Sequence, residues 1–212
     1  MVLQVAGLSH RPEVKDATAT LREGIIWLDG PELGVHRLIR MLASIERSET
    51  GTVLWNGRPV AGGSFRRMLG FLPNLRHQWF PNGPRVQQSL DYFAALWAVP
   101  RPRWARDQAL RQWDLEPLAN EPVVNLSSGQ QKRFALAVSF LMDPVVWIAE
   151  FPFTGLDGPS RVVLQDLLQH RRAVGTLNLL AETSDIMGAL AWTQKLELRD
   201  GVLVDRSIIS AK

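Results

Sequence analysis

Cysteine is absent from this chain of 212 residues, and its absence excludes several kinds of chemistry. Disulfide bonds, thiol nucleophiles and thiolate metal ligands all require it. The histidines His10, His36, His77 and His170 are scattered, and no two of them stand four residues apart as a zinc-binding pair on a helix does. We therefore expect neither a disulfide-stabilised domain nor a metal centre built on soft ligands.

Long apolar runs and an N-terminal signal pattern are also missing. No uncharged apolar stretch reaches the roughly 18 residues that a membrane-spanning helix needs, and the first residues lack the charged and apolar regions of a signal peptide. Low-complexity tracts and internal repeats are absent too. We expect a soluble, intracellular protein, whose contact with a membrane depends on a partner.

A strong excess of one charge is lacking as well. The formal net charge is +3, although the sequence pI is about 9.8, and acidic and basic residues are interspersed along the chain. This pattern does not indicate a basic face that would follow a nucleic-acid backbone. We expect no nucleic-acid partner.

The apolar residues that are present make up 46% of the chain and suffice for one substantial core. Runs of strand length alternate with helical patterns, which is typical of an α/β fold with a mainly parallel core sheet. An antiparallel part precedes it, and Asn56-Gly57 marks a tight hairpin there. The expected strands are 2–5, 24–28, 68–72, 145–149 and 176–181, the expected hairpins are 49–58 and one near 199–201, and the expected helices are 38–45, 131–138 and 160–172.

A proline-punctuated helical segment interrupts this alternation from about residue 76 to 125. It is flanked on both sides by the strand and helix patterns of the core. We therefore predict a single domain over residues 1–212. Its α/β core comprises 1–75 and 126–212, and a helical subdomain lies between them.

The stretch 125–133 is the most informative part of the sequence. It reads Asn-Leu-Ser-Ser-Gly-Gln-Gln-Lys-Arg and opens an apolar helical pattern. A helix start offers free N–H groups and a positive dipole end, which suit the terminal phosphate of a nucleotide. The stretch resembles the signature loop of the ATP-binding cassette (ABC) family, whose usual form is Leu-Ser-Gly-Gly-Gln. Segments 49–58, 153–157 and 198–201 also resemble that family and follow its order, so the resemblance implies an ABC cassette with a P-loop NTPase-like fold.

The family's phosphate loop, G-x-x-x-x-G-K-[ST], corresponds to residues 28–37, where key positions differ. Gly34 keeps the second glycine, whereas Val35 stands in the place of the lysine and His36 in that of the magnesium-binding hydroxyl. Each lost charge-assisted hydrogen bond removes about 1.5–3 kcal/mol. The family resemblance therefore implies a weakened site for the phosphates.

Two further features of this loop leave alternatives open. Asp29 takes the place of the first glycine, unless the loop is one residue shorter and Gly30 keeps it. His36 and Arg37 carry positive charge that would partly replace the lysine, or Arg37 is simply a solvated residue at a helix start. We describe Gly30, Gly34, His36 and Arg37 as a vestigial phosphate loop.

Other positions of the family's nucleotide site are altered too. Glu150 stands where the magnesium-binding aspartate is usual, and Phe151 stands where the catalytic glutamate is usual. Thr183 falls at the switch histidine, and Asn74 at the glutamine that senses the γ-phosphate. The adenine-stacking aromatic would lie near Pro12, where no aromatic residue occurs. Loss of a positioned base costs about 10²–10⁴ in rate, so we expect a pseudo-ATPase with no catalytic residue and with Glu150 as the one candidate metal ligand.

The intact signature implies a role in trans. In this family two cassettes dimerise head to tail, and each nucleotide lies between the phosphate loop of one and the signature of the other. The signature residues Ser127, Ser128, Gly129 and Gln130 would therefore contact ATP and magnesium held by a second cassette, and Asp157 would lie at the dimer contact. The partner cassette is either a second copy or a different chain, and no cofactor is expected in this chain's own site.

A membrane partner is implied by the same resemblance. The family docks an integral membrane permease on the helical subdomain, which is rich in aromatic side chains. Tyr92, Phe93 and Trp97 recur at helical spacing, a pattern more typical of a core than of an interface, although a mixed role is reasonable because aromatic residues are enriched in interfaces. We expect a cytoplasmic protein, peripheral to the inner membrane through the permease. The aromatic residues concerned are Trp79, Phe80, Tyr92, Phe93, Trp97, Trp104 and Trp113.

Three other readings of the sequence remain open at this point. In the first, the signature would be a relic that serves only as a helix cap. In the second, the chain would be an active ATPase with a rearranged site that uses His36, Arg37 and Glu150. Alternatively, it is a soluble scaffold with the ABC fold that no longer uses nucleotide.

Overall fold

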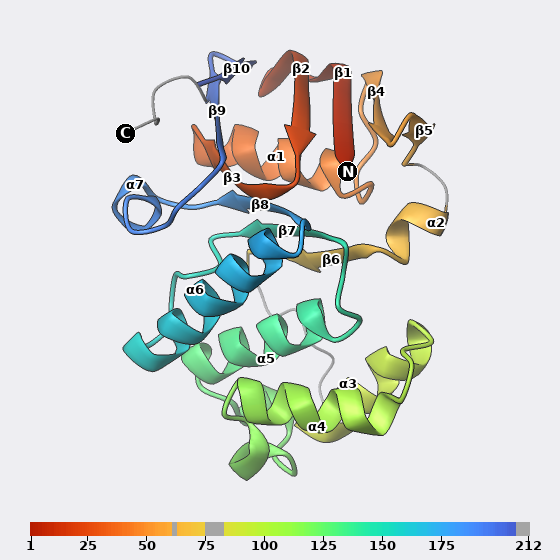
Figure 1. Cartoon of the computed structure of the whole chain (residues 1–212), viewed down its shortest axis with the longest axis vertical. Helices are drawn as coiled ribbons and strands as arrows, with labels where there is room; N and C mark the ends of the chain where they lie inside the picture. The colour runs from red at the N-terminus through yellow and green to blue at the C-terminus, as the bar shows by residue number, and fades with distance from the viewer. Residues whose placement is uncertain (61–62, 75–82, 207–212) are drawn as a thin grey trace.

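The computed structural model describes residues 1–60, 63–74 and 83–206, which form two sheets and the helices around them (Figure 1). The first sheet has the strand order β2-β1-β4-β5 and is antiparallel. The second has the order β10-β9-β3-β8-β7-β6. The strands of the first sheet are β1 (Val2–His10), β2 (Val14–Arg22), β4 (Thr50–Trp55) and β5 (Arg58–Pro59). Those of the second are β3 (Gly24–Asp29), β6 (Leu69–Leu72), β7 (Val146–Glu150), β8 (Leu177–Ala181), β9 (Gln194–Arg199) and β10 (Val202–Asp205).

Parallel strands form the centre of the second sheet, as the sequence predicts. β3, β8, β7 and β6 pair in parallel, and every residue of β7 and β8 is buried. Strands buried on both faces read as continuous apolar runs, which explains why 145–149 was recognisable, whereas 176–181 is apolar apart from Thr176 and Asn178. The predicted α/β class with an antiparallel N-terminal part is confirmed. The sequence patterns did not indicate β2, whose residues lack an apolar run.

Helix α1 (Glu32–Leu42) lies between the two sheets (Figure 1). Its buried side chains, including Leu38 and Ile39, pack with residues of the antiparallel sheet and with β7 and β8 in one core. The prediction that this helix continues to residue 45 is wrong. The chain turns at Ser44, which has φ 56°, and Ile45 is 48% exposed.

The remaining long helices cover the opposite face of the second sheet (Figure 1). α5 (Ser128–Phe140) and α6 (Gly158–Ala173) lie next to the sheet, and the helices of the segment 83–125 lie beyond them. The expected start of the signature helix near Gln131 is wrong, because α5 begins at Ser128. The other helices are α2 (Gly63–Arg66), α3 (Val86–Leu96), α4 (Pro102–Gln112) and α7 (Ser184–Met187), with 3-10 turns η1 (Glu116–Leu118) and η2 (Val123–Asn125).

The aromatic residues of the helical segment divide between core and surface. Trp113 is buried, and Phe93 and Trp97 stack on each other and pack partly against the core. Tyr92, by contrast, is 63% exposed and does not belong to the core, so the three residues divide between the core and the surface. Trp104 is also exposed. Trp79 and Phe80 lie outside the described residues, as does His77.

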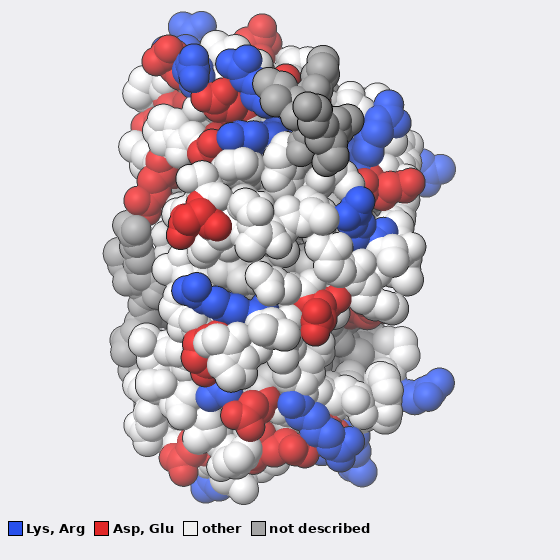
Figure 2. Space-filling view, turned by 60° about the vertical axis from the view of Figure 1, so that its left-hand side comes forward, with Lys and Arg blue, Asp and Glu red and all other residues white. Residues whose placement is uncertain are grey.

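Charged side chains are mixed on the surface. Figure 2 shows Lys and Arg interspersed with Asp and Glu, and no continuous area of one sign forms among the described residues of that face. Within the described part of the chain, no helix is both long enough and apolar enough to cross a membrane.

Candidate functional site

The signature segment forms a capped and exposed helix start. Ser127 is the N-cap of α5: its Oγ accepts a hydrogen bond from the Gln130 N–H at 3.3 Å, and the Gln130 side chain accepts one from the Ser127 N–H at 2.8 Å. This reciprocal capping box fixes the first turn. Ser127 and Ser128 are exposed, and a Cβ added at Gly129 would meet only the Gly155 carbonyl oxygen at an ordinary 3.4 Å. Packing therefore does not require glycine at position 129.

The connection between β3 and α1 is too short to wrap a phosphate group. β3 ends at Asp29 and α1 starts at Glu32, so only Gly30 and Pro31 lie between them. The helix is already regular there, since the Val35 N–H donates to the Pro31 carbonyl at 3.0 Å. This short connection favours the alignment in which Gly30 keeps the first glycine and the loop has lost one residue.

Both glycines of this segment are needed for close packing against β9. A Cβ at Gly30 would lie 2.6 Å from the Leu198 carbonyl oxygen, and the residue has φ +146°. A Cβ at Gly34 would lie 2.7 Å from Leu198 Cδ2 and 3.2 Å from the Glu13 carbonyl oxygen. Val35, at the lysine position, is 3% exposed and belongs to the core. The glycines therefore have a structural explanation that does not involve a ligand.

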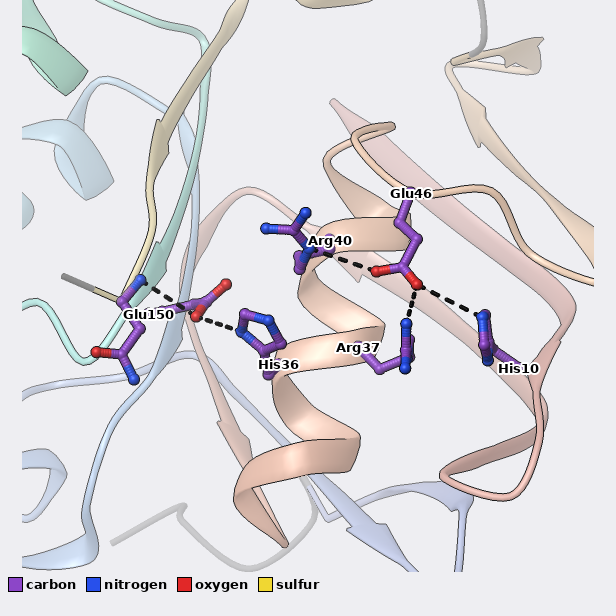
Figure 3. A network of polar contacts seen from close by, with 7 residues as sticks. His10, His36, Arg37, Arg40, Glu46 and Glu150 are labelled. Atoms are coloured by element: carbon purple, nitrogen blue, oxygen red, sulfur yellow. Dashed lines mark hydrogen bonds and ion pairs between the residues drawn. The ribbon is translucent and has the colours of Figure 1, made fainter. Parts of the chain in front are cut away.

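His36 and Glu150 are brought into direct contact, although 114 residues separate them (Figure 3). His36 Nδ1 lies 2.8 Å from Glu150 Oε2, and because an ionised carboxylate only accepts hydrogen bonds, the imidazole donates. The Asn74 backbone N–H donates to the same oxygen at 3.2 Å. Glu150 is 1% exposed, and its Oε1 has no hydrogen-bond partner among the described residues.

Arg37 does not join this contact. Its side chain points away from Glu150 and pairs with Glu46, which also contacts Arg40 and His10 (Figure 3). Partial burial opposes ionisation of Glu46, but the hydrogen bond and the charge of Arg37 outweigh it and hold the pKa of Glu46 below its usual value. Arg37, expected either to assist phosphate binding or to be solvated at the helix start, is placed by the structure in this ion pair.

Phe151 places a backbone carbonyl, and no acid, at the end of β7. It has φ 48°, its N–H donates to the Ala181 carbonyl at 2.8 Å, and its own carbonyl accepts a 2.7 Å hydrogen bond from Lys132 Nζ. Lys132 comes from α5 and is 5% exposed. Burial lowers the pKa of Lys132 to about 8, against the opposing charges of Glu182 and Glu150.

Glu182 completes this buried group. Its carboxylate accepts hydrogen bonds from the Phe153 N–H at 2.9 Å and the Thr183 N–H at 3.0 Å. Burial nevertheless raises the pKa of Glu182. Sequence reasoning missed Lys132 and Glu182 as site residues. One signal for Lys132 was available, because it precedes the apolar residues Ala135 and Leu136 by three and four positions and so shares their buried helix face.

A cavity of about 480 Å³ joins several of the predicted positions. It brings the end of β3 together with the start of α5, the end of β7 and the segment after β8. Val35 and Asp157 do not line it. Asp157 instead caps α6, where its Oδ1 accepts a hydrogen bond from the Ser160 N–H at 2.9 Å, and hydrogen bonding from the Ser160 side chain and backbone keeps the pKa of Asp157 low. The lining residues are Gly30, Glu32, Asn74, Ser128, Gln131, Lys132, Phe151, Thr154, Gly155 and Thr183.

The residues around this cavity do not fit a magnesium-bound nucleotide triphosphate. Such a ligand needs a phosphate-wrapping loop, a lysine directed at the phosphates and a hydroxyl on the metal. The loop here has two residues, and Lys132 already donates to the Phe151 carbonyl. His36 has no hydroxyl, and its imidazole contacts the carboxylate that would hold the metal. Among the described residues, no group of three or more His, Asp or Glu side chains is placed to hold a metal ion.

Comparisons with known proteins agree with the fold. The family model described as ABC transporter matches residues 34–154. A cytochrome c biogenesis ATP-binding export protein CcmA of Bordetella parapertussis is 32% identical over 172 residues, which cover 78% of this chain and 74% of that protein. The protein of the same name from Salmonella typhi is 29% identical and covers 81% and 82% of the two chains.

Solved structures show the same architecture. An ATP-binding subunit of an ABC transporter superposes with a TM-score of 0.87 at 20% identity, covering 98% of this chain and 90% of that one. The cbiO1 protein of Clostridium perfringens, described as part of the ABC transporter complex cbiONQ, gives 0.75 at 22% identity, covering 95% and 86%. With the family model matching more than half of its length, the chain belongs to the ABC transporter family and is one of its nucleotide-binding subunits.

Proposed function

We propose that this chain is a non-catalytic ABC subunit that completes the nucleotide site of a competent second cassette. The observation that carries the proposal is the contrast between two helix starts in this chain, that of α5 and that of α1. The start of α5 at Ser127 and Ser128 is exposed and regularly capped. The start of α1, by contrast, lacks the loop, the lysine and the hydroxyl that a phosphate donor site uses.

The absence of a positioned base supports the non-catalytic part of the proposal. Phe151 follows Glu150 at the end of β7, and its side chain cannot activate a water molecule. The two nearby buried carboxylates are engaged: Glu150 with His36 and Asn74, and Glu182 with two backbone N–H groups. We therefore assign no hydrolytic step to this chain's own site.

The chemistry of the signature supports a contact in trans. Backbone N–H groups in the first turn of a helix stay free of intrahelical partners and attract anions. In α5 the Gln130 N–H is used by the Ser127 cap, so the groups concerned are the N–H groups of Ser128 and Gly129, next to the exposed Ser128 hydroxyl. Gly129 leaves room there without being needed for the chain's own packing. These features suit a phosphate group that a second cassette carries.

The relatives suggest where this subunit works. Their names describe ATP-binding export proteins of cytochrome c biogenesis. We infer that this chain also serves an exporter, together with a separate integral membrane permease that holds it at the membrane. The exposed side chains Tyr92, Leu96 and Trp104 on α3 and α4 are the candidate permease contacts.

The test of the shared site is Gly129→Asp in the complex purified through a tag on this chain. A carboxylate at the start of α5 would repel the partner's nucleotide phosphates, so we expect the ATPase activity of the complex to fall about tenfold or more. Unchanged activity of a correctly assembled complex would contradict the proposal.

Gly129→Ala is the matched control for folding. It adds a methyl group without charge and contacts only the Gly155 carbonyl oxygen. Alanine in a helix is favoured over glycine by about 1 kcal/mol, so the isolated variant should be at least as stable as the wild type. If Gly129→Asp lowers activity only by unfolding the chain, its melting temperature will fall well below that of the alanine variant.

A further inference from the structure

The fold family implies a magnesium ion beside Glu150, and the imidazole of His36 lies at that place. His36 projects from the first half of α1 toward the end of β7, where Glu150 is buried (Figure 3). The distance of 2.8 Å between His36 Nδ1 and Glu150 Oε2 is that of a direct hydrogen bond. No space remains between these two atoms for a cation with its own coordination shell.

The coordination chemistry of magnesium disfavours this pair of side chains as ligands. Mg²⁺ takes six oxygen ligands at about 2.0–2.1 Å in octahedral geometry and keeps several waters. Imidazole nitrogen suits zinc, copper or nickel better. Glu150 Oε2 already accepts from His36 and from the Asn74 N–H, and Oε1, which has no hydrogen-bond partner among the described residues, is buried away from solvent.

Positive charge reaches the buried carboxylates from the protein instead. Lys132 Nζ is held at the end of β7 by the Phe151 carbonyl, and its charge interacts with both Glu150 and Glu182. A buried carboxylate without a counter-charge is costly. Lys132 therefore supplies a counter-charge to both carboxylates, and the His36 imidazole occupies the hydrogen-bonding position on Glu150 Oε2.

We propose that His36 occupies the cation position on Glu150 and thereby makes this chain's half-site independent of divalent metal ions. The inference rests on the proposed function, in which this half-site is silent, and it names the residue that excludes the cation. It further implies that one substitution to the family's hydroxyl, His36→Ser, reopens the position.

Mn²⁺ titration of the isolated chain, followed by electron paramagnetic resonance, tests this. Mn²⁺ is a paramagnetic probe with the same preference for oxygen ligands as Mg²⁺. The wild type should bind no more Mn²⁺ than Glu150→Gln. His36→Ser should bind it about tenfold more tightly or better, and the double variant His36→Ser with Glu150→Gln should lose the gain. His170→Ser, at an exposed histidine on α6, is the matched control and should behave as the wild type.

Three results would overturn the proposal. The first is wild-type Mn²⁺ binding that Glu150→Gln abolishes, because the position would then be open. The second is a folded His36→Ser chain that gains no binding. The third is Zn²⁺ binding by the wild type that is lost in His36→Ser, which would make the imidazole a metal ligand. The comparison of wild type with Glu150→Gln uses the isolated chain and needs neither the serine variant nor a partner cassette. Its failure can therefore be distinguished from a failure of the Gly129→Asp test, which uses the complex.

Discussion

Lys132 is a buried cation in an environment that its chemistry does not favour. A lysine is rarely buried without compensation, yet this one is 5% exposed in the middle of the site. The Phe151 carbonyl and the charges of Glu150 and Glu182 supply that compensation. The cost of desolvating its ammonium group should therefore depend on pH in a way that can be measured.

We predict that Lys132 opposes folding less as the pH rises. Below about pH 8 its ammonium is charged in both states, so the whole burial cost opposes folding. Between about pH 8 and the usual pKa of 10.5, the unfolded chain holds a proton that the folded chain has released, and stability rises with pH. The free energy of unfolding of wild type minus Lys132→Met should increase by up to about 3 kcal/mol between pH 7.5 and 10.

Urea denaturation of the two chains at several pH values measures this difference. Comparison with Lys132→Met cancels the titration of the other lysines and of the tyrosine, which both chains share. A difference that stays constant or falls as the pH rises would show that the lysine is not desolvated in the folded chain.

At the scale of the elements, the packing of α1 against β9 explains why Gly34 is a glycine. Its position was predicted from a nucleotide-binding pattern, whereas the contact that requires it is with Leu198. Residues 34 and 198 meet only because β9 pairs with β3 in the second sheet. A sequence pattern cannot separate these two causes, since both of them select glycine.

We predict that Gly34→Ala destabilises the chain by about 1–2 kcal/mol. Overpacking costs about 1–3 kcal/mol, and the higher helix propensity of alanine returns at most about 1 kcal/mol. Thermal or urea denaturation measures the change. In a Leu198→Val background, which removes the contacting Cδ2 atom but leaves the Glu13 carbonyl oxygen 3.2 Å from the new Cβ, the same substitution should be clearly less destabilising. Equal effects of Gly34→Ala in both backgrounds would contradict this account of the glycine.

The elements that could be predicted are those with a local cause. β7 and β8 appear as apolar runs, and Asn56-Gly57 marks the turn between β4 and β5. The end of α1 could not be predicted, because Ile45 continues the apolar spacing but lies after the turn at Ser44. Tertiary structure overrides periodicity in such places.

The sequence identified which positions of the candidate site are altered, but it could not show which side chains contact one another. The sequence indicated that Val35, His36, Glu150 and Phe151 stand at altered positions. It could not indicate that His36 donates to Glu150, because 114 residues separate them and only the fold brings them together. The same holds for Lys132, which was part of the signature segment but reaches the end of β7.

At the scale of the whole molecule, the cavity lies where the sheet meets the helical part of the chain. Its walls come from the end of β3, the start of α5 and the segment after β8. Lys132, which lines the cavity, interacts with the buried carboxylates Glu150 and Glu182 behind it. The start of α5 faces solvent with its capping box complete. This arrangement supports a subunit whose own half-site does not use nucleotide and whose signature contacts the nucleotide of a partner cassette.

The most direct test of this central claim is a cryo-electron microscopy structure of the purified complex with a non-hydrolysable ATP analogue and magnesium. We predict nucleotide density between the partner cassette's phosphate loop and residues 127–130 of this chain. No nucleotide or metal density is expected in front of the start of α1. A magnesium nucleotide bound at residues 30–37 of this chain, or no nucleotide beside its signature, would contradict the account.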